Sequence, residues 1–452
     1  MLFIGVLIVT LVVVCSTYVG VRHFSTAKAN DANGDWSMFM GDIARSGLNT
    51  TETTITPATA VHLNYAGRFA TGGYVVATPA FSNGVMYEGS WDGYEYAIDA
   101  TTHTLLWKQF LGITVQKKYC YSKSVGVTSS AAISNGMLYV GGGDGYLYAL
   151  NTSDGSVVWK TLLGNPPYYN FSSPVVYNNK IYIGLAAFCD PPYVQGKVES
   201  FDAATGTLVA STALTSGSQT GAPVWSSLAI DASTNTVFAT TGNNGSKTIN
   251  YQPLAEAIVS FDADTLAVKS SWQIPASQQI SDSDFGATPT LFDVNGGHYI
   301  GVMNKNGIYY VLDRNNLPAG PVWEQAAPGT PQADDYVSAS CYMNGTLYVA
   351  GGATAINGQQ YGGTISALDA ATGAVKWSQA MLGQTVSSTL CVNTGLVVDN
   401  QGNVVEVRNA TNGTILYRHT TMRRVEGTSV IYNGELYTPS TDSNIWFFKL
   451  KL

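Results

Sequence analysis

One pattern recurs seven times along this chain and limits what the chain can fold into. Each unit has a tight turn such as Asn-Gly, a strand containing Tyr, a second tight turn and a strand ending in Asp-Ala or a variant, followed by Thr-x-Gly and an aromatic residue. The Asp-Ala step recurs at intervals of 40–60 residues, at Asp99, Asn151, Asp202, Asp262, Asp313, Asp369 and Asn409. Asn-Gly supplies the positive backbone angles of a two-residue hairpin. Four short strands joined by tight turns at this period predict the blades of a β-propeller.

The number of predicted blades is eight, because an incomplete unit follows the seven complete ones. This last unit opens at Glu426 and ends at Leu450 without an outer strand. Residues Leu63 to Phe69 resemble that missing strand and precede the first full unit. Joining the two ends of the chain in one blade would close the ring and protect its sheet edges. The predicted fold class is therefore all-β, an eight-bladed β-propeller over residues 61–452 preceded by an N-terminal hydrophobic helix.

The composition agrees with a globular all-β chain and excludes other classes. Charged residues make up 12% of the chain and hydrophobic residues 45%, which excludes disorder driven by high charge and low hydrophobicity. The net charge is −8 and no basic run is present, so a nucleic-acid partner is not expected.

The N-terminus carries a targeting signal. Leu2 to Val21 is an uncharged apolar run of 20 residues, long enough to cross a bilayer as a helix. Residues 1–24 are expected to be a signal peptide or a membrane anchor, and residues 25–60 a polar tether and lead segment. The protein is accordingly expected outside the cytoplasm, periplasmic or at the cell surface, and either membrane-anchored or secreted.

The cysteines fit no metal or haem motif. None of Cys120, Cys189, Cys341 and Cys391 stands in a CxxC or CxxCH spacing, so neither structural zinc nor covalent c-type haem is expected. Four cysteines outside the membrane permit two disulfides in three pairings. Propeller topology favours a Cys120–Cys189 bond, because both residues belong to connections on one face of adjacent blades. Cys341 and Cys391 are expected to be buried and reduced.

The repeat resembles a known family. Leu/Phe-Asp-Ala-x-Thr-Gly-x-x-x-Trp, repeated through the chain after residue 60, is similar to the quinoprotein alcohol dehydrogenase-like propellers. These comprise pyrroloquinoline quinone (PQQ) dehydrogenases, polyvinyl-alcohol dehydrogenase-like proteins and outer-membrane assembly propellers that bind no quinone. The lead segment from Asp35 to Gly47 also resembles one that precedes many PQQ-like repeats. Because one fold carries several functions, function must be sought where the repeat is broken.

Four breaks in the middle blades resemble the family's cofactor site. The resemblance implies that Trp225, in Gly-Ala-Pro-Val-Trp-Ser, forms the floor beneath PQQ. It implies that Asn243, in Thr-Gly-Asn-Asn, binds calcium and that Asp284, in Asp-Ser-Asp-Phe-Gly-Ala, is the catalytic carboxylate. Lys305, in Lys-Asn-Gly-Ile-Tyr-Tyr, would contact the quinone oxygens. An indole stacks on a planar ring, a carboxylate accepts a hydroxyl proton and a cation stabilises charge on a reduced quinone.

Each of these residues also has a purely structural interpretation. Trp225 can be a core residue, Asn243 a turn residue and Lys305 a solvated cation, while Asp282 is placed as well as Asp284. The chain also departs from the enzyme pattern. Of the family's two adjacent cysteines only one is present, Cys120, and the arginine that follows that pair is missing. The family's calcium-binding Glu has no clean match, and Asp190 is a possible substitute.

Two functions therefore compete. The first is a PQQ- and calcium-dependent dehydrogenase that oxidises a small-molecule or polymeric alcohol or polyol and passes electrons to a separate acceptor. The second is a cofactor-free propeller that acts as a membrane-associated protein-binding scaffold. The enzyme hypothesis predicts that the four residues converge at one end of the central channel.

Overall fold

The computed structural model describes residues 35–451, apart from 116–121, 165–167, 189–192, 246–251, 327–336, 353, 357 and 384. The expected N-terminal helix and the expected Cys120–Cys189 bond lie outside the described residues, as does Asp190. In the described part of the chain, no helix has the length and apolarity needed to cross a membrane.

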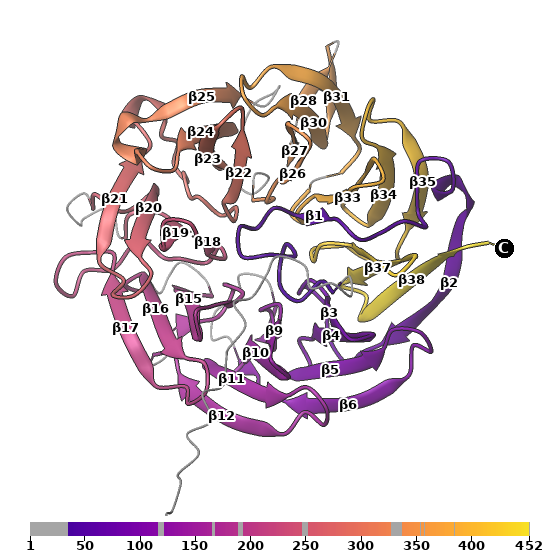
Figure 1. The fold of residues 1–452 in the computed structure, drawn as a ribbon, viewed down its shortest axis with the longest axis horizontal. Helices are drawn as coiled ribbons and strands as arrows, with labels where there is room; N and C mark the ends of the chain where they lie inside the picture. The colour runs from indigo at the N-terminus through magenta and orange to yellow at the C-terminus, as the bar shows by residue number, and fades with distance from the viewer. Residues whose placement is uncertain are drawn as a thin grey trace, which may run out of the picture.

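The fold is a closed ring of eight antiparallel sheets, as predicted (Figure 1). In each blade the first strand lies nearest the channel and the fourth forms the rim. Blade 1 consists of β3 (Ala80–Ser82), β4 (Val85–Gly89), β5 (Tyr94–Asp99) and β6 (Leu105–Phe110), and blade 2 of β9 (Ala132–Ser134), β10 (Met137–Gly141), β11 (Tyr146–Asn151) and β12 (Val157–Leu162). Blade 3 consists of β14 (Val175–Tyr177), β15 (Lys180–Ala187), β16 (Lys197–Asp202) and β17 (Leu208–Ala213), and blade 4 of β18 (Ala229–Asp231), β19 (Thr236–Thr240), β20 (Ala257–Asp262) and β21 (Val268–Gln273).

Blade 5 consists of β22 (Thr290–Val294), β23 (Gly297–Met303), β24 (Ile308–Asp313) and β25 (Pro321–Ala326), and blade 6 of β26 (Cys341–Met343), β27 (Thr346–Gly351), β30 (Gly363–Asp369) and β31 (Val375–Met381). Blade 7 consists of β32 (Leu390–Val392), β33 (Leu396–Gln401), β34 (Val404–Asn409) and β35 (Ile415–Thr420), and blade 8 of β36 (Val430–Tyr432), β37 (Glu435–Ser440), β38 (Asn444–Leu450) and β2 (Leu63–Ala70). The remaining elements are β1 (Leu48–Asn49), β7 (Thr114–Val115), β8 (Ser124–Val125), β13 (Tyr168–Tyr169), β28 (Thr354–Ile356), β29 (Gln359–Tyr361) and the 3₁₀ turns η1 (Ala60–His62), η2 (Ala276–Gln278) and η3 (Leu317–Ala319).

The last blade is closed by the strand that the sequence predicted. β2 pairs antiparallel with β38, with Leu63 opposite Leu450 and Ala70 opposite Asn444. β2 thus completes blade 8, whose other three strands come from the C-terminal end of the chain, and the edge of β38 is covered.

The repeated residues make one recurring set of contacts that joins each blade to the next. Asp99 accepts hydrogen bonds from the backbone amides of Thr101 and Thr102 and so fixes the turn between the third and fourth strands. Trp107 on the rim strand donates from its indole nitrogen to the Thr152 carbonyl of blade 2. A Cβ at Gly155 would come within 2.5 Å of the Trp107 ring, so only glycine lets the indole pack there. Trp159, Trp323 and Trp377 make the same bond to the next blade.

A second set of bonds links the inner ends of the blades. In seven of the eight blades one Ser or Thr stands just before the first strand: Thr78, Ser130, Ser173, Ser227, Thr288, Ser388 and Thr428. At this position the backbone amide of every blade except blade 5 donates to the hydroxyl of the same position in the next blade, over 2.8–3.2 Å, and in blade 6 the donor is Ala339. We call this set the hydroxyl ring. It is interrupted at Ala339 of blade 6, which has no hydroxyl to accept from Thr288.

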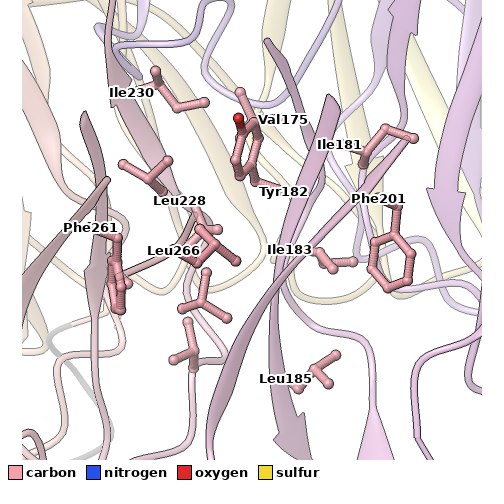
Figure 2. Close-up of a cluster of buried hydrophobic side chains, with 14 of the residues drawn as sticks. Val175, Ile181, Tyr182, Ile183, Leu185, Phe201, Leu228, Ile230, Phe261 and Leu266 are labelled. Atoms are coloured by element: carbon pink, nitrogen blue, oxygen red, sulfur yellow. The ribbon is translucent and has the colours of Figure 1, made fainter. Parts of the chain in front are cut away.

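The core lies between the blades. Figure 2 shows one cluster in which Ile183 and Phe201 of blade 3 pack near Leu228 and Phe261 of blade 4. Blade 1 departs from this apolar pattern. Glu88 and Glu95 are buried where blade 2 has Val140 and Leu147, and within the described residues none of their carboxylate oxygens has a hydrogen-bond partner. Burial raises the pKa of both carboxyl groups well above its usual value.

Residues 35–49 lie across one end of the channel. The segment makes backbone bonds to the first strands of several blades, including Ile133 amide to Ser37 carbonyl and Leu291 amide to Ala44 carbonyl. The fully buried Arg45 donates to the carbonyls of Leu228 and Pro174. These contacts lie near the turns that join the first and second strands. The opposite face, formed by the connections that enter each first strand, carries the candidate site.

One cysteine expectation is wrong. Cys341 and Cys391 are buried as expected, but they form a disulfide, with their Cα atoms 5.7 Å apart. They begin or lie in β26 and β32, the innermost strands of adjacent blades. Innermost strands converge toward the channel, which brings residues of neighbouring blades within disulfide distance.

Candidate active site

The four predicted residues meet at one end of the channel. Trp225 lies in the connection that enters β18, and Asp284 in the one that enters β22. Asn243 follows β19 and Lys305 follows β23. Both kinds of connection emerge on the same face of a propeller, and blades 4 and 5 are neighbours. Residues 80 positions apart in the sequence are therefore in contact.

The Asp284 carboxylate is the centre of this group. Its Oδ1 accepts a hydrogen bond of 2.5 Å from the backbone amide of Asn243. Its Oδ2 accepts from the Trp225 indole nitrogen at 3.3 Å and from the Lys305 ammonium at 3.4 Å. Burial raises the pKa of Asp284 above its usual value, and Lys305 acts against that rise. A carboxylate held by three donors is fixed in orientation and can accept a proton from a ligand.

Lys305 is shared between two carboxylates and an aromatic face. Its ammonium lies 3.0 Å from Asp282 and 3.4 Å from Asp284, and 5.3 Å from the centre of the Trp225 ring. Burial lowers the pKa of Lys305, but Asp284 and Asp282 outweigh burial and raise that pKa above its usual value. The side chain is thus a charged ammonium at the mouth of the channel, not a freely solvated lysine.

Asn243 makes hydrogen bonds to the loop that carries Asp282 and Asp284. Its side-chain amide donates to Asp282 at 2.7 Å, and its side-chain oxygen accepts from the Ser283 backbone amide at 3.1 Å. Together with its backbone bond to Asp284, these contacts position residues 282–284 as a unit.

Two glycines make room for the group. A Cβ at Gly242 would lie 3.0 Å from the Asp284 carboxylate and 2.8 Å from Pro223. A Cβ at Gly286 would lie 2.1 Å from the Trp225 ring, so the indole rests directly on the backbone of blade 5. Any larger residue at 286 would displace the indole.

Glu256 belongs to the site and was missed by the sequence interpretation. Its backbone is bonded to Gly242, and its own backbone angle φ is 51°, which is uncommon for a residue with a side chain. Burial raises the pKa of Glu256 to about 7, and the negative charges of Asp284 and Asp282 add to the rise. The only signal in the sequence is one acidic residue within the otherwise apolar stretch from Leu254 to Val259.

The site has more acidic than basic groups. Among the residues that the structure describes, Asp282, Asp284 and Glu256 face one cation, Lys305, which favours a cationic ligand or a bound metal ion. Among the described residues, however, no group of three or more His, Cys, Asp or Glu side chains is arranged to hold a metal ion. Asp190, the expected substitute for the family's calcium-binding Glu, is outside the described residues.

The other side of the mouth is aromatic. Phe171 occupies the position in blade 3 that Trp225 occupies in blade 4, two residues before the hydroxyl ring. It stacks on Phe188, with ring centres 5.3 Å apart, and Phe188 packs against Trp91 of blade 1. The mouth therefore has a charged wall from blades 4 and 5 and an apolar wall from blades 1 to 3.

Comparison with known proteins gives two family matches. Residues 53–341 match the model described as glucose/ethanol/alcohol dehydrogenase, beta-propeller domain. Residues 316–451 match the model described as outer membrane protein assembly factor BamB.

Curated relatives match over part of their length. The quinohemoprotein alcohol dehydrogenase ADH IIB of Pseudomonas putida is 26% identical over 287 residues, which is 53% of this chain and 40% of the relative. The BamB protein of Escherichia coli is 31% identical over 138 residues, which is 30% of this chain and 33% of the relative. The chain thus matches less than half the length of these relatives.

Solved structures share the fold. The quinohemoprotein alcohol dehydrogenase of Comamonas testosteroni aligns with a TM-score of 0.75 at 18% identity, covering 93% of this chain and 81% of that structure. A europium-containing methanol dehydrogenase aligns with a TM-score of 0.75 at 17% identity, covering 91% of this chain and 90% of that structure.

Proposed function

The chain belongs to the glucose/ethanol/alcohol dehydrogenase β-propeller family, and on that premise we propose that it is an extracytoplasmic PQQ-dependent dehydrogenase of an alcohol or polyol. One observation carries the proposal. Trp225, Asn243, Asp284 and Lys305, which break the repeat in family order, lie within contact distance at one end of the channel. This convergence is what the enzyme hypothesis predicts.

Trp225 and Lys305 are the residues that suit a flat quinone with negatively charged oxygens, and a bound cation would balance the carboxylates around them. The Trp225 ring lies close against the backbone of Gly286, and the Lys305 ammonium lies over that ring, so an aromatic surface and a positive charge stand together. PQQ, when bound, supplies the two-electron acceptor for the hydride of the alcohol. Asp284 would accept the hydroxyl proton, and the donors around it hold the carboxylate in a single orientation.

Calcium is a separate part of the proposal. Asn243 is proposed as one calcium ligand, and Asp190 as a second. The excess of carboxylates at the site supports a cation there, and carboxylate and amide oxygens are the ligands calcium prefers. The electrons are proposed to pass to a separate acceptor.

The proposed location rests on two features. The Cys341–Cys391 disulfide is typical of an oxidising compartment, and the apolar run from Leu2 to Val21 is typical of a targeting segment.

The proposal is tested by titrating the purified full chain with PQQ in calcium and following tryptophan fluorescence and dye-linked alcohol oxidation. Asp284→Asn should lower turnover by about 10²- to 10⁴-fold, the usual contribution of a general base, and leave quinone binding nearly unchanged. Trp225→Ala and Lys305→Met should instead weaken quinone binding. Lys376→Met is the matched control, because this half-exposed lysine pairs with Asp369 away from the mouth.

Two results would contradict the assignment. One is a wild-type chain whose fluorescence does not respond to PQQ at saturating calcium. The other is Asp282→Asn abolishing turnover while Asp284→Asn does not, since the base would then be Asp282.

The second candidate is a cofactor-free scaffold. The match of residues 316–451 to the BamB model favours it, because that family is described as an outer membrane assembly factor. This function predicts no fluorescence response to PQQ with or without calcium, so the same titration separates the two candidates.

A further inference from the structure

The rim of the ring is not uniformly polar. The exposed large apolar residues of the rim and its adjoining loop are concentrated in blades 1–3: Leu105, Leu106, Phe110, Ile113 and Val115; Val157, Val158 and Leu162; Leu208 and Val209. The rim strands of blades 4–8 expose one such residue each, and the segments adjoining those strands add four more: Val268, Val322, Val375, Ile415 and Tyr65; Ile280, Leu382, Met422 and Val61. In Figure 1 β6 and β12 lie side by side, and β25 lies on the opposite side of the ring.

Tyrosine and lysine accompany these aliphatic residues. The Lys108 ammonium on β6 lies 4.4 Å from the Tyr94 ring centre, and that of Lys160 on β12 lies 4.5 Å from Tyr146. Neither rim strand contains an acidic residue, whereas β25 contains Glu324. Aliphatic side chains flanked by Tyr rings and Lys ammonium groups match the chemistry of a lipid–water interface, where apolar stems insert and cationic ends remain hydrated.

The described part of the chain begins beside blade 1. Asp35, the first described residue, accepts hydrogen bonds from Ser82 and from the backbone amide of Asn83, in the first turn of blade 1. The apolar run ends at Val21, so residues 22–34 separate it from Asp35. Thirteen residues span at most about 45 Å when fully extended, so a membrane that holds the run is within reach of blades 1 and 2.

We propose that the apolar rim formed by β6 and β12 rests on an anionic lipid bilayer and orients the ring edge-on to the membrane. The aliphatic residues would enter the headgroup region, and Lys108 and Lys160 would pair with lipid phosphates. The channel axis would then lie parallel to the membrane surface, and the channel mouth would remain accessible to soluble molecules. This inference extends the proposed location and does not depend on quinone binding.

Site-specific labelling of the full chain tests the proposal. Leu106→Cys and Val158→Cys would each carry an environment-sensitive nitrobenzoxadiazole dye, and Val322→Cys is the matched control. The three side chains stand one residue before the rim Trp of their blades and are 51%, 53% and 52% exposed. The unsubstituted protein, taken through the same labelling, gives the background from the native cysteines.

With phosphatidylglycerol-containing vesicles, the dye at 106 and at 158 should shift to the blue and brighten, and the dye at 322 should not. The shift should shrink in vesicles of phosphatidylcholine alone. An equal shift at all three positions, or none at 106 and 158, would overturn the proposal. So would a blue shift at 106 that appears without vesicles and grows with protein concentration, because a second copy of the chain would then cover the rim. The PQQ titration is independent of these labels, so failure of one proposal leaves the other standing.

Discussion

Replacing Ser173 by Ala removes one link of the hydroxyl ring and nothing else. Ser173 is buried before the first strand of blade 3, and its hydroxyl accepts from the Ser130 amide of blade 2 at 3.0 Å. Its own amide donates to Ser227 and is kept in the variant. The change therefore leaves one buried amide without an acceptor.

The expected cost follows from that amide. A buried donor left unsatisfied costs about 1–3 kcal/mol, more than the roughly 0.5–1.5 kcal/mol that a satisfied bond contributes. Ser173→Ala should therefore lower the free energy of unfolding by about 1–3 kcal/mol. Ser153→Ala, in an exposed turn, is the control and should change it by no more than about 0.5 kcal/mol.

Blade 6 offers the reverse experiment. Ala339 stands where the ring is interrupted, and Thr288 of blade 5 is the residue whose amide would donate to it. Ala339→Ser should supply the missing acceptor and raise the free energy of unfolding by about 0.5–1.5 kcal/mol.

Guanidinium unfolding followed by tryptophan fluorescence measures both changes as shifts of the midpoint at constant slope. The reasoning is refuted if Ser173→Ala matches the exposed control, or if Ala339→Ser destabilises the protein as much as Ser173→Ala does. Either result would mean that neighbouring blades hold their register without these bonds.

Three further outcomes are expected. Cys341→Ser should lower the free energy of unfolding by about 4 kcal/mol by the loop-entropy relation, because the bond closes a loop of 50 residues, and denaturant unfolding measures the loss. Burial raises the pKa of Glu88 and Glu95 in the folded state, so the free energy of unfolding should fall as pH rises above about 4.5 and the two acids lose their protons. Glu95→Leu should make that fall smaller and raise the melting temperature at pH 7. Melting curves recorded at several pH values measure both effects. Deleting Leu63–Ala70 should expose the edge of β38 and make the protein aggregate, measured by light scattering.

The site was partly visible in the sequence. Trp225, Asn243, Asp284 and Lys305 stood out because they interrupt the repeat and appear in the order of a known family. Glu256 gave no comparable signal, because its place beside Asp284 depends on how the backbone of residues 242–244 folds against blade 5. Asn243 was predicted as a metal ligand, and the structure adds that it braces the loop of Asp282 and Asp284.

The sequence by itself determined the number of blades and the strand that closes the ring. Those features depend on turns, and a turn such as Asn83-Gly84 is specified by residues adjacent in the chain, with φ angles of 52° and 77° that Asn and Gly tolerate. The tertiary structure alone decided the Cys341–Cys391 pairing, the hydroxyl ring and the path of residues 35–49 across the channel. Each of these joins residues of different blades, and their distances are set by how the blades pack around the axis, which no local pattern of residues specifies.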